Sequence, residues 1–317
     1  MKNAIIKKIK DDLNSGFKTK EFLEFATNSL HYIDRGFIKA GNHNFPYIII
    51  NKENSINGQH SNFLITPICF SGPIGFNLEE LHIQINRTLK HYELMGGFIQ
   101  TCFELNENNS FKYYQWGSAY IDFRTCYKIR LGNSLEDYIG KVKNDSKKRL
   151  KNILNEKKKY FLAEASSDKD IKIFAEMYSR NAKESKFSPQ YCFTLPCWIE
   201  LLKNNLFKLY LLHYKGKVVS GTIITKINSG FDYTFMAYDR EKSDVSRANL
   251  LYIARYLNDS GKFLSLGGGI FEDDSLSKFK LSMGGEPYRY ARYRFQIGLD
   301  NESNKHIIKK KLKSRWP

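Results

Sequence analysis

Several features that identify other protein classes are missing from this sequence. The chain has five cysteines, an odd number, and no CxxC pair, so it predicts neither a disulfide framework nor a zinc site. None of the seven histidines has a carboxylate or cysteine partner at a recognisable spacing, so we predict no metal site and no catalytic triad. No stretch approaches the roughly 18 apolar residues that cross a bilayer. The N-terminus also lacks the apolar region of a signal peptide, which predicts a cytoplasmic protein without membrane insertion.

Acidic residues are too few to balance the basic ones. The chain has 50 lysines and arginines against 33 aspartates and glutamates, which gives a formal net charge of +17. A strongly positive surface favours polyanionic partners, namely nucleic acid, phosphorylated metabolites or an anionic membrane face. Charge alone does not choose among them, and a lysine-rich solvated surface would give the same number.

Apolar residues are abundant enough for a folded chain. Hydrophobic residues make up 42% of the sequence and aromatic residues 15%, so enough apolar surface can be buried to offset the entropy lost on folding. A length of 317 residues fits two cores of ordinary size. We predict domains at 1–132 and 133–317, because the pattern of helices and strands starts again at Ser134.

The first half of the sequence predicts helices followed by strands. Amphipathic spacing indicates helices over residues 5–13 and 22–30. Segments rich in β-formers predict four strands, and a helix with Asn77 as its cap and Gly96-Gly97 as its stop lies between the second and third of them. The predicted strands are 45–50, 63–68, 98–103 and 119–123, and the helix is 77–95.

The second half predicts a longer α+β series. Ser134 is placed to cap a helix that carries basic residues from Lys141 to Lys151. Tyr214-Lys215-Gly216-Lys217 indicates a tight hairpin. The other expected elements are a strand near Phe161, helices at 170–182, 246–258 and 276–281, and strands at 231–238, 263–266 and 288–297. The fold class is α+β, with two tandem domains of mixed, mostly antiparallel sheets flanked by helices.

The most informative segment is a strand that ends in glycines and is followed by a lysine-bearing helix. The strand runs Leu264-Ser265-Leu266-Gly267-Gly268-Gly269, and Phe279-Lys280-Leu281-Ser282-Met283-Gly284 follows. Glycines allow the backbone to approach a ligand closely, which makes Gly268 and Gly269 candidate substrate-binding residues.

These residues resemble the FemABX and tandem GNAT acyltransferases, whose C-terminal half carries such a strand and then a Phe-Lys-x-x-Phe-Gly element. Met283 stands where the family usually has an aromatic residue. Ser71-Gly72-Pro73-Ile74-Gly75 is similar to the family's Gly-Gly-Pro turn, and residues 146–153 are similar to its basic helix. The order of the elements in the second half is that of GNAT domains, so the resemblance spans nearly the whole chain.

The resemblance implies a binding site for acetyl-CoA or another short acyl-CoA. Its pyrophosphate would lie at the start of the helix after Tyr238, because a helix N-terminus offers free N–H groups and a partial positive charge. The expected cofactor-binding residues are Ser246, Arg247, Ala248 and Asn249, with the pantetheine arm along Met236, Ala237 and Tyr238. This segment departs from the usual GNAT loop, Q/R-x-x-G-x-G/A, and an ordinary capped helix is the alternative.

Lys280 is the first candidate for a catalytic role, because the resemblance gives this lysine contacts with the acceptor's phosphate and the reacting carbonyl. Asp239 and Asp274 are the candidate bases, although solvated or helix-capping carboxylates would have the same sequence. The candidate substrate contacts are Arg149, Lys186 and Tyr191.

Three acceptors remain open. The resemblance favours N-acylation of a nucleotide-linked amino sugar, carried by dTDP or UDP, in polysaccharide biosynthesis. The first alternative is the FemABX reaction, in which aminoacyl-tRNA donates to a peptidoglycan precursor. The second is a non-catalytic nucleic-acid-binding protein, for which nine basic residues between Lys141 and Lys159 are the only argument. We expect no nucleic-acid partner in the favoured case.

Overall fold

The computed structural model describes most of the second half of the chain and part of the first. The described residues are 19–28, 32–40, 43–53, 60–66, 83–84, 87, 94–100, 119–132, 134–188, 191–227, 230–257, 262–269 and 273–296. The predicted helix at 5–13, the Ser71–Gly75 turn and most of the predicted helix at 77–95 lie outside these residues.

The chain divides into two compact units. Unit 1 comprises Met1–Ser29, Cys126–Gly268 and Ser275–Pro287, and unit 2 comprises Leu30–Thr125, Gly269–Asp274 and Tyr288–Pro317. Each unit draws on more than one stretch of chain, and the predicted single boundary after residue 132 remains a prediction.

Unit 2 contains strands paired in the order β1-β2-β3-β4-β11, and β11 belongs to this unit from Tyr288 onward. All pairs are antiparallel except β3 with β4, which is parallel. Strand β1 was not predicted, and β4 begins inside the predicted helix at 77–95, so that prediction is wrong for Leu94 and Met95. The strands are β1 (Asp34–Ala40), β2 (His43–Glu53), β3 (His60–Ile65), β4 (Leu94–Gln100) and β11 (Glu286–Gln296).

Unit 1 contains strands paired in the order β5-β10-β9-β8-β7-β6, and β5 belongs to this unit from Cys126 onward. Its pairs are antiparallel except β9 with β10, which is parallel. Lys215 and Gly216 have φ angles of 50° and 78° in the turn between β7 and β8, which confirms the predicted hairpin. The strands are β5 (Ala119–Arg130), β6 (Tyr160–Ala165), β7 (Phe207–Tyr214), β8 (Lys217–Ile227), β9 (Gly230–Tyr238) and β10 (Phe263–Gly268).

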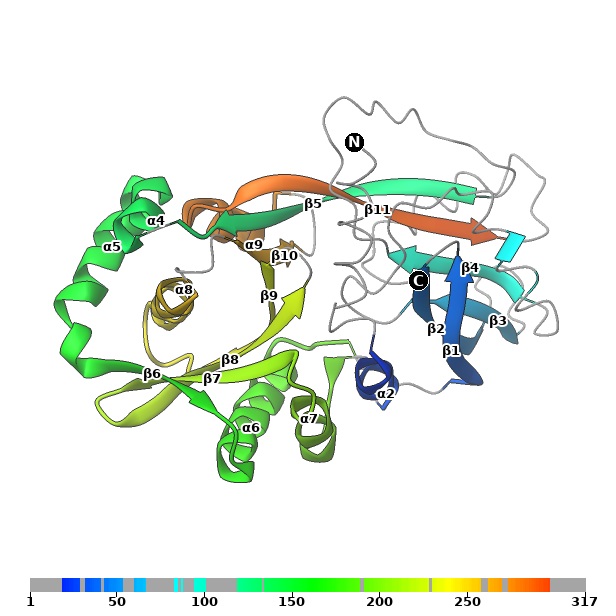
Figure 1. Ribbon diagram of the computed structural model, residues 1–317, viewed down its shortest axis with the longest axis horizontal. Coiled ribbons are helices and arrows are strands. Elements are labelled where there is room, and N and C mark those ends of the chain that lie inside the picture. The colour runs from blue at the N-terminus through cyan, green and yellow to red at the C-terminus, as the bar shows by residue number, and fades with distance from the viewer. Residues whose placement is uncertain are drawn as a thin grey trace. The chain divides into compact units, whose positions relative to one another are not determined.

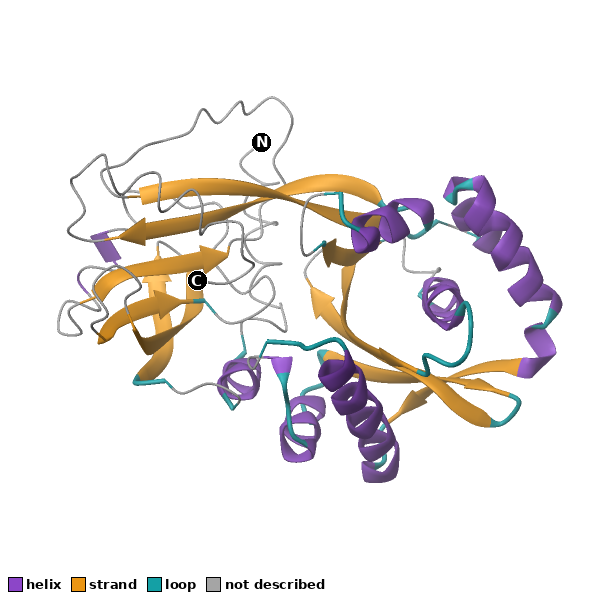
Figure 2. Cartoon of the chain, turned by 180° about the vertical axis from the view of Figure 1, so that it is seen from behind, coloured by secondary structure: helices purple, strands orange, loops and turns teal. Residues whose placement is uncertain are grey.

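Helices cover both faces of the unit 1 sheet (Figures 1 and 2). One face carries α2 (Lys20–Thr27), α6 (Asp168–Glu184) and α7 (Leu195–Leu202). The other carries α8 (Val245–Tyr256), with α4 (Leu135–Lys141), α5 (Asn144–Asn155) and α9 (Ser275–Ser282) around it. A short 3-10 helix, η3 (Lys157–Lys159), leads into β6. The predicted α+β class with mixed, mostly antiparallel sheets is thus confirmed.

The basic helix after Ser134 is two helices. Ser134 caps α4 as predicted, since its Oγ accepts a hydrogen bond from the Asp137 N–H at 3.1 Å. Val142 then adopts an extended conformation with its side chain buried, and the Lys143 N–H donates to the Ser282 carbonyl at 3.0 Å. This contact, distant in sequence, separates α4 from α5.

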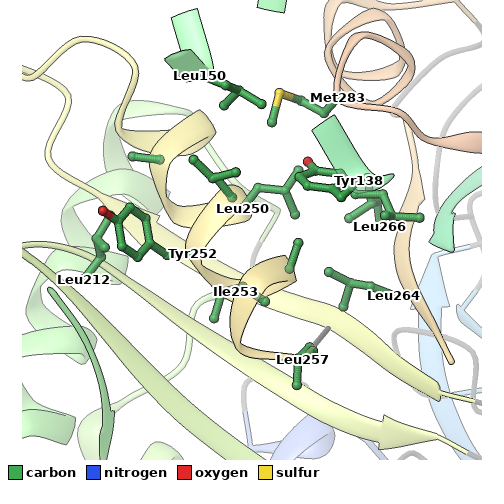
Figure 3. Close-up of a cluster of buried hydrophobic side chains, with 14 of the residues drawn as sticks. Tyr138, Leu150, Leu212, Leu250, Tyr252, Ile253, Leu257, Leu264, Leu266 and Met283 are labelled. Carbon is green, nitrogen blue, oxygen red and sulfur yellow. The ribbon is translucent and has the colours of Figure 1, made fainter. Parts of the chain in front are cut away.

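Two clusters of buried side chains hold unit 1 together. On the α8 face, Leu250 and Ile253 of α8 and Leu257, which follows the helix, meet Leu264 and Leu266 of β10 (Figure 3). The opposite face is aromatic, with Trp198 fully buried among Phe25, Phe174, Tyr178, Phe193 and Phe235. Both clusters fix the strands between them, including β9 and β10.

Candidate functional site

The parallel pair β9 and β10 separates along its length. Its described register joins Gly230, Phe231 and Asp232 to Phe263, Leu264 and Ser265, and no described pair follows. The strands begin very close together, since a Cβ at Gly230 would lie 2.1 Å from the Phe263 carbonyl oxygen. Among the described residues, the second half of β9, which carries Met236, Ala237 and Tyr238, therefore has no strand paired with it on the side of β10.

Two of these three residues have their backbone groups engaged. The Asn181 side chain, from α6, accepts from the Tyr238 N–H at 2.9 Å and donates to the Tyr238 carbonyl at 3.0 Å. Antiparallel pairing turns the Ala237 groups towards β8 and those of Met236 away from it. Met236 has no recorded partner on that side among the described residues, so it is the predicted position best placed to pair with an extended ligand.

Lys280 reaches the glycine end of β10. Its Nζ donates to the Gly268 carbonyl at 2.7 Å, and its side chain is 8% exposed. Gly267 has a φ of +64°, and a Cβ there would lie 3.9 Å from the lysine Nζ. The structure thus brings Lys280 and Gly268 together, with half-buried Gly269 next in the chain. Lys280 is therefore a buried lysine, and its catalytic role remains a prediction.

A buried carboxylate that the sequence reasoning missed lies in the same region. Asp232 is 4% exposed, and its Oδ1 accepts from the Thr234 hydroxyl at 2.9 Å. Burial raises the pKa of Asp232 to about 6, against the lowering effects of hydrogen bonds from Ser265 and Thr234 and of the Lys280 charge. An aspartate inside a strand otherwise rich in aromatic and β-branched residues was the available signal.

The N-terminus of α8 holds a carboxylate. Asp244 precedes the helix with a φ of 59° and makes no side-chain cap. Its Oδ1 accepts from Nη1 of Arg149 at 3.1 Å and from Nη1 of Arg247 at 2.9 Å. The Arg247 guanidinium also lies over the Phe279 ring, 5.5 Å from its centroid. The structure thus brings Arg149 and Arg247 together, on an anion that belongs to the chain itself.

The other predicted cofactor residues face the protein interior to different degrees. Ala248 and Asn249 are fully buried, whereas Ser246 is half-buried. The Asn249 Nδ2 donates to the Ser220 hydroxyl at 2.8 Å, and its Oδ1 accepts from the Thr222 hydroxyl at 2.7 Å. The Tyr233 hydroxyl donates to the same oxygen. The Asn249 side chain therefore links α8 to β8 and β9.

The two candidate bases lie at chain turns. The Asp239 N–H donates to the Val219 carbonyl at 2.8 Å, and its Oδ1 accepts from the Glu241 N–H at 3.1 Å. Asp274 is half-buried and immediately precedes α9. The catalytic roles of both carboxylates remain predictions.

Lys186 and Tyr191 lie on the face opposite Arg149. Lys186 follows α6 with a φ of 50° and lines an open cavity of about 530 Å³, together with Lys183 and Phe187. Tyr191 is half-buried, and its N–H donates to the Ser188 carbonyl at 2.9 Å. Arg149 is on α5, across the sheet, so the three predicted substrate contacts do not form one cluster.

Neither a metal centre nor a membrane span is found in the described part of the chain. It contains no group of three or more His, Cys, Asp or Glu residues placed to hold a metal ion. None of its helices is both long and apolar enough to cross a membrane.

The comparisons with known proteins identify the fold. No protein-family model matches the sequence, and no curated protein matches it. The structure of FemX is similar with a TM-score of 0.60 at 11% identity, covering 92% of this chain and 94% of that one. The structure of L-PGS from Bacillus licheniformis is similar with a TM-score of 0.58 at 13% identity, covering 94% and 98%.

A third structure agrees with these two. It is the C-terminal domain of an Agrobacterium fabrum protein described as a lysylphosphatidylglycerol synthetase, with a TM-score of 0.52 at 12% identity, covering 91% of this chain and 94% of that one. At such low identity the likeness establishes the fold alone. The chain therefore has a tandem GNAT-like fold similar to that of FemX and L-PGS.

Proposed function

We propose that this protein transfers an acyl group from an activated ester to an amine. The observation that carries the proposal is the Lys280 ammonium, buried at the glycine end of β10 and hydrogen-bonded to the Gly268 carbonyl. It lies in the unit where β9 and β10 separate, so an extended donor could pair with Met236 while its carbonyl approaches the lysine. The shared fold of FemX and L-PGS supports the same conclusion.

The chemistry requires one positive group and one route for a proton. The amine nitrogen attacks the carbonyl carbon, and negative charge develops on the carbonyl oxygen, where an ammonium group in a water-poor site stabilises it strongly. The bond between carbon and the leaving oxygen then breaks, and the proton lost by the amine passes to that oxygen. Lys280 supplies the positive group.

The donor that fits best is an aminoacyl ester of tRNA, as in the FemABX reaction. Asp244 already occupies the N-terminus of α8, and a pyrophosphate there would meet a carboxylate. The Tyr238 backbone, which a pantetheine arm would use, is bonded to Asn181. Two of the contacts that acyl-CoA would need are therefore taken by the chain itself, which favours a donor without CoA.

The acceptor is proposed to carry an anionic group. Lys183 and Lys186 line the open cavity after α6, with Phe187 and Phe193 beside them. Cations next to aromatic rings suit a phosphate attached to a larger organic group. This observation also favours the second candidate function, in which acetyl-CoA or a short acyl-CoA acylates a nucleotide-linked amino sugar carried by dTDP or UDP.

Thermal-shift titration separates these donors and acceptors. Charged tRNA, uncharged tRNA, acetyl-CoA, and dTDP- and UDP-linked amino sugars are each added, because a ligand that binds only the folded protein raises its melting temperature. Stabilisation by tRNA and by a phosphorylated acceptor supports the first candidate, and stabilisation by CoA together with a nucleotide sugar supports the second. Binding of tRNA that weakens steeply with salt, without any transfer, would instead favour a nucleic-acid-binding protein.

A further inference from the structure

Positive charge is concentrated on one surface of unit 1. Residues 141–159, which include α5 and η3, contain nine lysines and arginines but only two acidic residues, Asp145 and Glu156. The longer helix α6, also in unit 1, has four basic and four acidic residues. The basic excess is therefore a local feature and not a property that all surface helices of this lysine-rich chain share.

Helix α5 turns its basic side away from the protein. Leu150 and Ile153 are buried in the cluster that also contains the apolar side chains of α8. The helix lies outside α8, away from the sheet (Figures 1 and 2). Lys148, Arg149 and Lys151 are exposed. Because residues three apart on a helix share a face, Lys148 and Lys151 lie side by side in solvent.

Most of these cations have no acidic partner. Glu156 is bound to Lys159 at 2.8 Å, and Asp244 is bound to Arg149 at 3.1 Å. Within the part of the chain that the structure describes, the exposed lysines 148, 151, 157 and 158 form no ion pair. The Lys215 N–H donates to the Lys159 carbonyl at 2.8 Å, which places another exposed lysine beside η3. We call these residues the basic surface: Lys148, Arg149, Lys151, Lys157, Lys158 and Lys215.

One end of the basic surface adjoins the helix that carries Lys280. The Lys143 N–H donates to the Ser282 carbonyl at 3.0 Å, and the Ser146 and Ser282 hydroxyl oxygens lie 3.0 Å apart. Ser282 is on α9, two residues after Lys280. A long polyanion that presented its end to Lys280 could therefore continue along α5, which is about 18 Å long.

The basic surface suits a nucleic-acid backbone better than a membrane. A helix that lies on a bilayer inserts its apolar face among the lipids, whereas the apolar face of α5 is already buried against α8. None of the exposed large apolar side chains found among the described residues lies between 141 and 159. Exposed lysines, arginines and asparagines are the residues that contact phosphates, and Asn152 and Asn155 are also exposed on α5.

We propose that the basic surface binds the phosphate backbone of a tRNA whose aminoacyl end is held near Lys280. Binding of a polyanion follows from the exposed and unpaired charge, whereas the choice of tRNA rests on the proposed function. Phosphate contacts position a nucleic acid without reading its sequence. The basic surface would therefore contribute affinity for the donor and take no part in the chemical step.

Binding of uncharged tRNA tests this surface without any transfer reaction. Fluorescence anisotropy of labelled tRNA is measured at several KCl concentrations for the native chain and for a variant with Lys148→Gln, Lys151→Gln, Lys157→Gln and Lys158→Gln together. The variant should bind at least about tenfold more weakly at low salt. The slope of log K against log salt should also decrease by about 2–3, because each lost phosphate contact removes about 0.7–0.9.

A control variant removes the same number of charges elsewhere in unit 1. It combines Lys169→Gln, Lys172→Gln, Lys203→Gln and Lys208→Gln, which replace exposed lysines outside the basic surface. The control should bind tRNA within about threefold of the native chain. Circular dichroism should show that both variants melt as the native chain does, since exposed lysines contribute little to folding.

Three outcomes of the binding experiment would overturn the proposal. The native chain does not bind tRNA, the two variants lose affinity equally, or the basic-surface variant loses none. Vesicles of phosphatidylglycerol and phosphatidylcholine and a duplex DNA are tested beside tRNA. If the four lysines are needed for vesicles and not for tRNA, the surface faces a membrane. If they hold the DNA more tightly than tRNA, the assignment to tRNA is wrong.

The transfer assay separates this proposal from the proposed function. With aminoacyl-tRNA as donor, the basic-surface variant should have a higher KM and an unchanged kcat, because the surface binds the donor away from the reacting atoms. An unchanged KM would refute the basic surface while leaving the transfer reaction in place. Binding of tRNA through these lysines without any transfer would refute the proposed function and leave the binding surface in place.

Discussion

Replacement of Asn249 by alanine tests whether this residue holds the fold or contacts a ligand. The structure buries the side chain completely and gives its amide three partners, on Ser220, Thr222 and Tyr233. The substitution removes all three hydrogen bonds from the interior. Thr222 and Tyr233 can still bond to each other, since their hydroxyl oxygens lie 3.4 Å apart, so part of the loss is recovered.

The expected loss is about 2–4 kcal/mol of unfolding free energy. Each buried polar group left without a partner costs about 1–3 kcal/mol, and the better helix propensity of alanine returns only about 0.5 kcal/mol. Urea unfolding followed by circular dichroism measures the difference. Asn152→Ala is the matched control, because Asn152 is exposed on α5 and should change stability by less than about 0.5 kcal/mol. The reasoning is refuted if Asn249→Ala is as stable as that control and instead loses affinity for acetyl-CoA.

Three other predictions concern the same region. Gly230→Ala should lower the free energy of unfolding by more than about 3 kcal/mol, because a Cβ 2.1 Å from the Phe263 carbonyl oxygen forces β9 and β10 apart; an unchanged melting temperature would contradict this. The pKa of Asp232, about 6 in the folded chain and 3.8 ordinarily, means that the folded state binds more protons between these values. Stability relative to Asp232→Asn should therefore fall by about 2.4 kcal/mol as pH rises from 4 to 7, and parallel pH profiles would argue against it. Asp244→Asn should raise the affinity for pyrophosphate about tenfold, since it frees two arginines and a helix N-terminus; calorimetry that shows equal binding would remove the argument against CoA.

Local chemistry explains what could be predicted of the fold. The hairpin at Lys215-Gly216 and the cap at Ser134 follow from the residues themselves, and both are present. The division between α4 and α5 could not be predicted, because the basic pattern continues through it. That break depends on a hydrogen bond from Lys143 to Ser282, which lies in a distant segment.

The residues of the candidate site were likewise predicted only where the signal lies in one continuous segment of sequence. Lys280 and Gly268 were predicted together, because their motif is continuous in sequence and resembles that of a known family. Asp232 was missed, since its burial depends on the pairing of β9 with β8 and β10, which the sequence of β9 alone does not show. Asn249 was predicted to bind the cofactor because it lies near a helix N-terminus. That position does not reveal which side chains of the first turns face the sheet, and the Asn249 side chain is buried against β8.

The most direct measurement of the central claim is transfer of label from a radioactive donor by Lys280→Met and its matched control, Lys278→Met. Aminoacyl-tRNA and acetyl-CoA are offered separately, with a peptidoglycan precursor or a nucleotide-linked amino sugar as acceptor. We predict that label passes from aminoacyl-tRNA to an amine in the native chain and in Lys278→Met. Lys280→Met should be at least about 100-fold slower under conditions where it remains folded, as expected when a group that stabilises the developing oxyanion is lost. Equal transfer by both variants would contradict the role of Lys280, and transfer from acetyl-CoA alone would contradict the proposed donor.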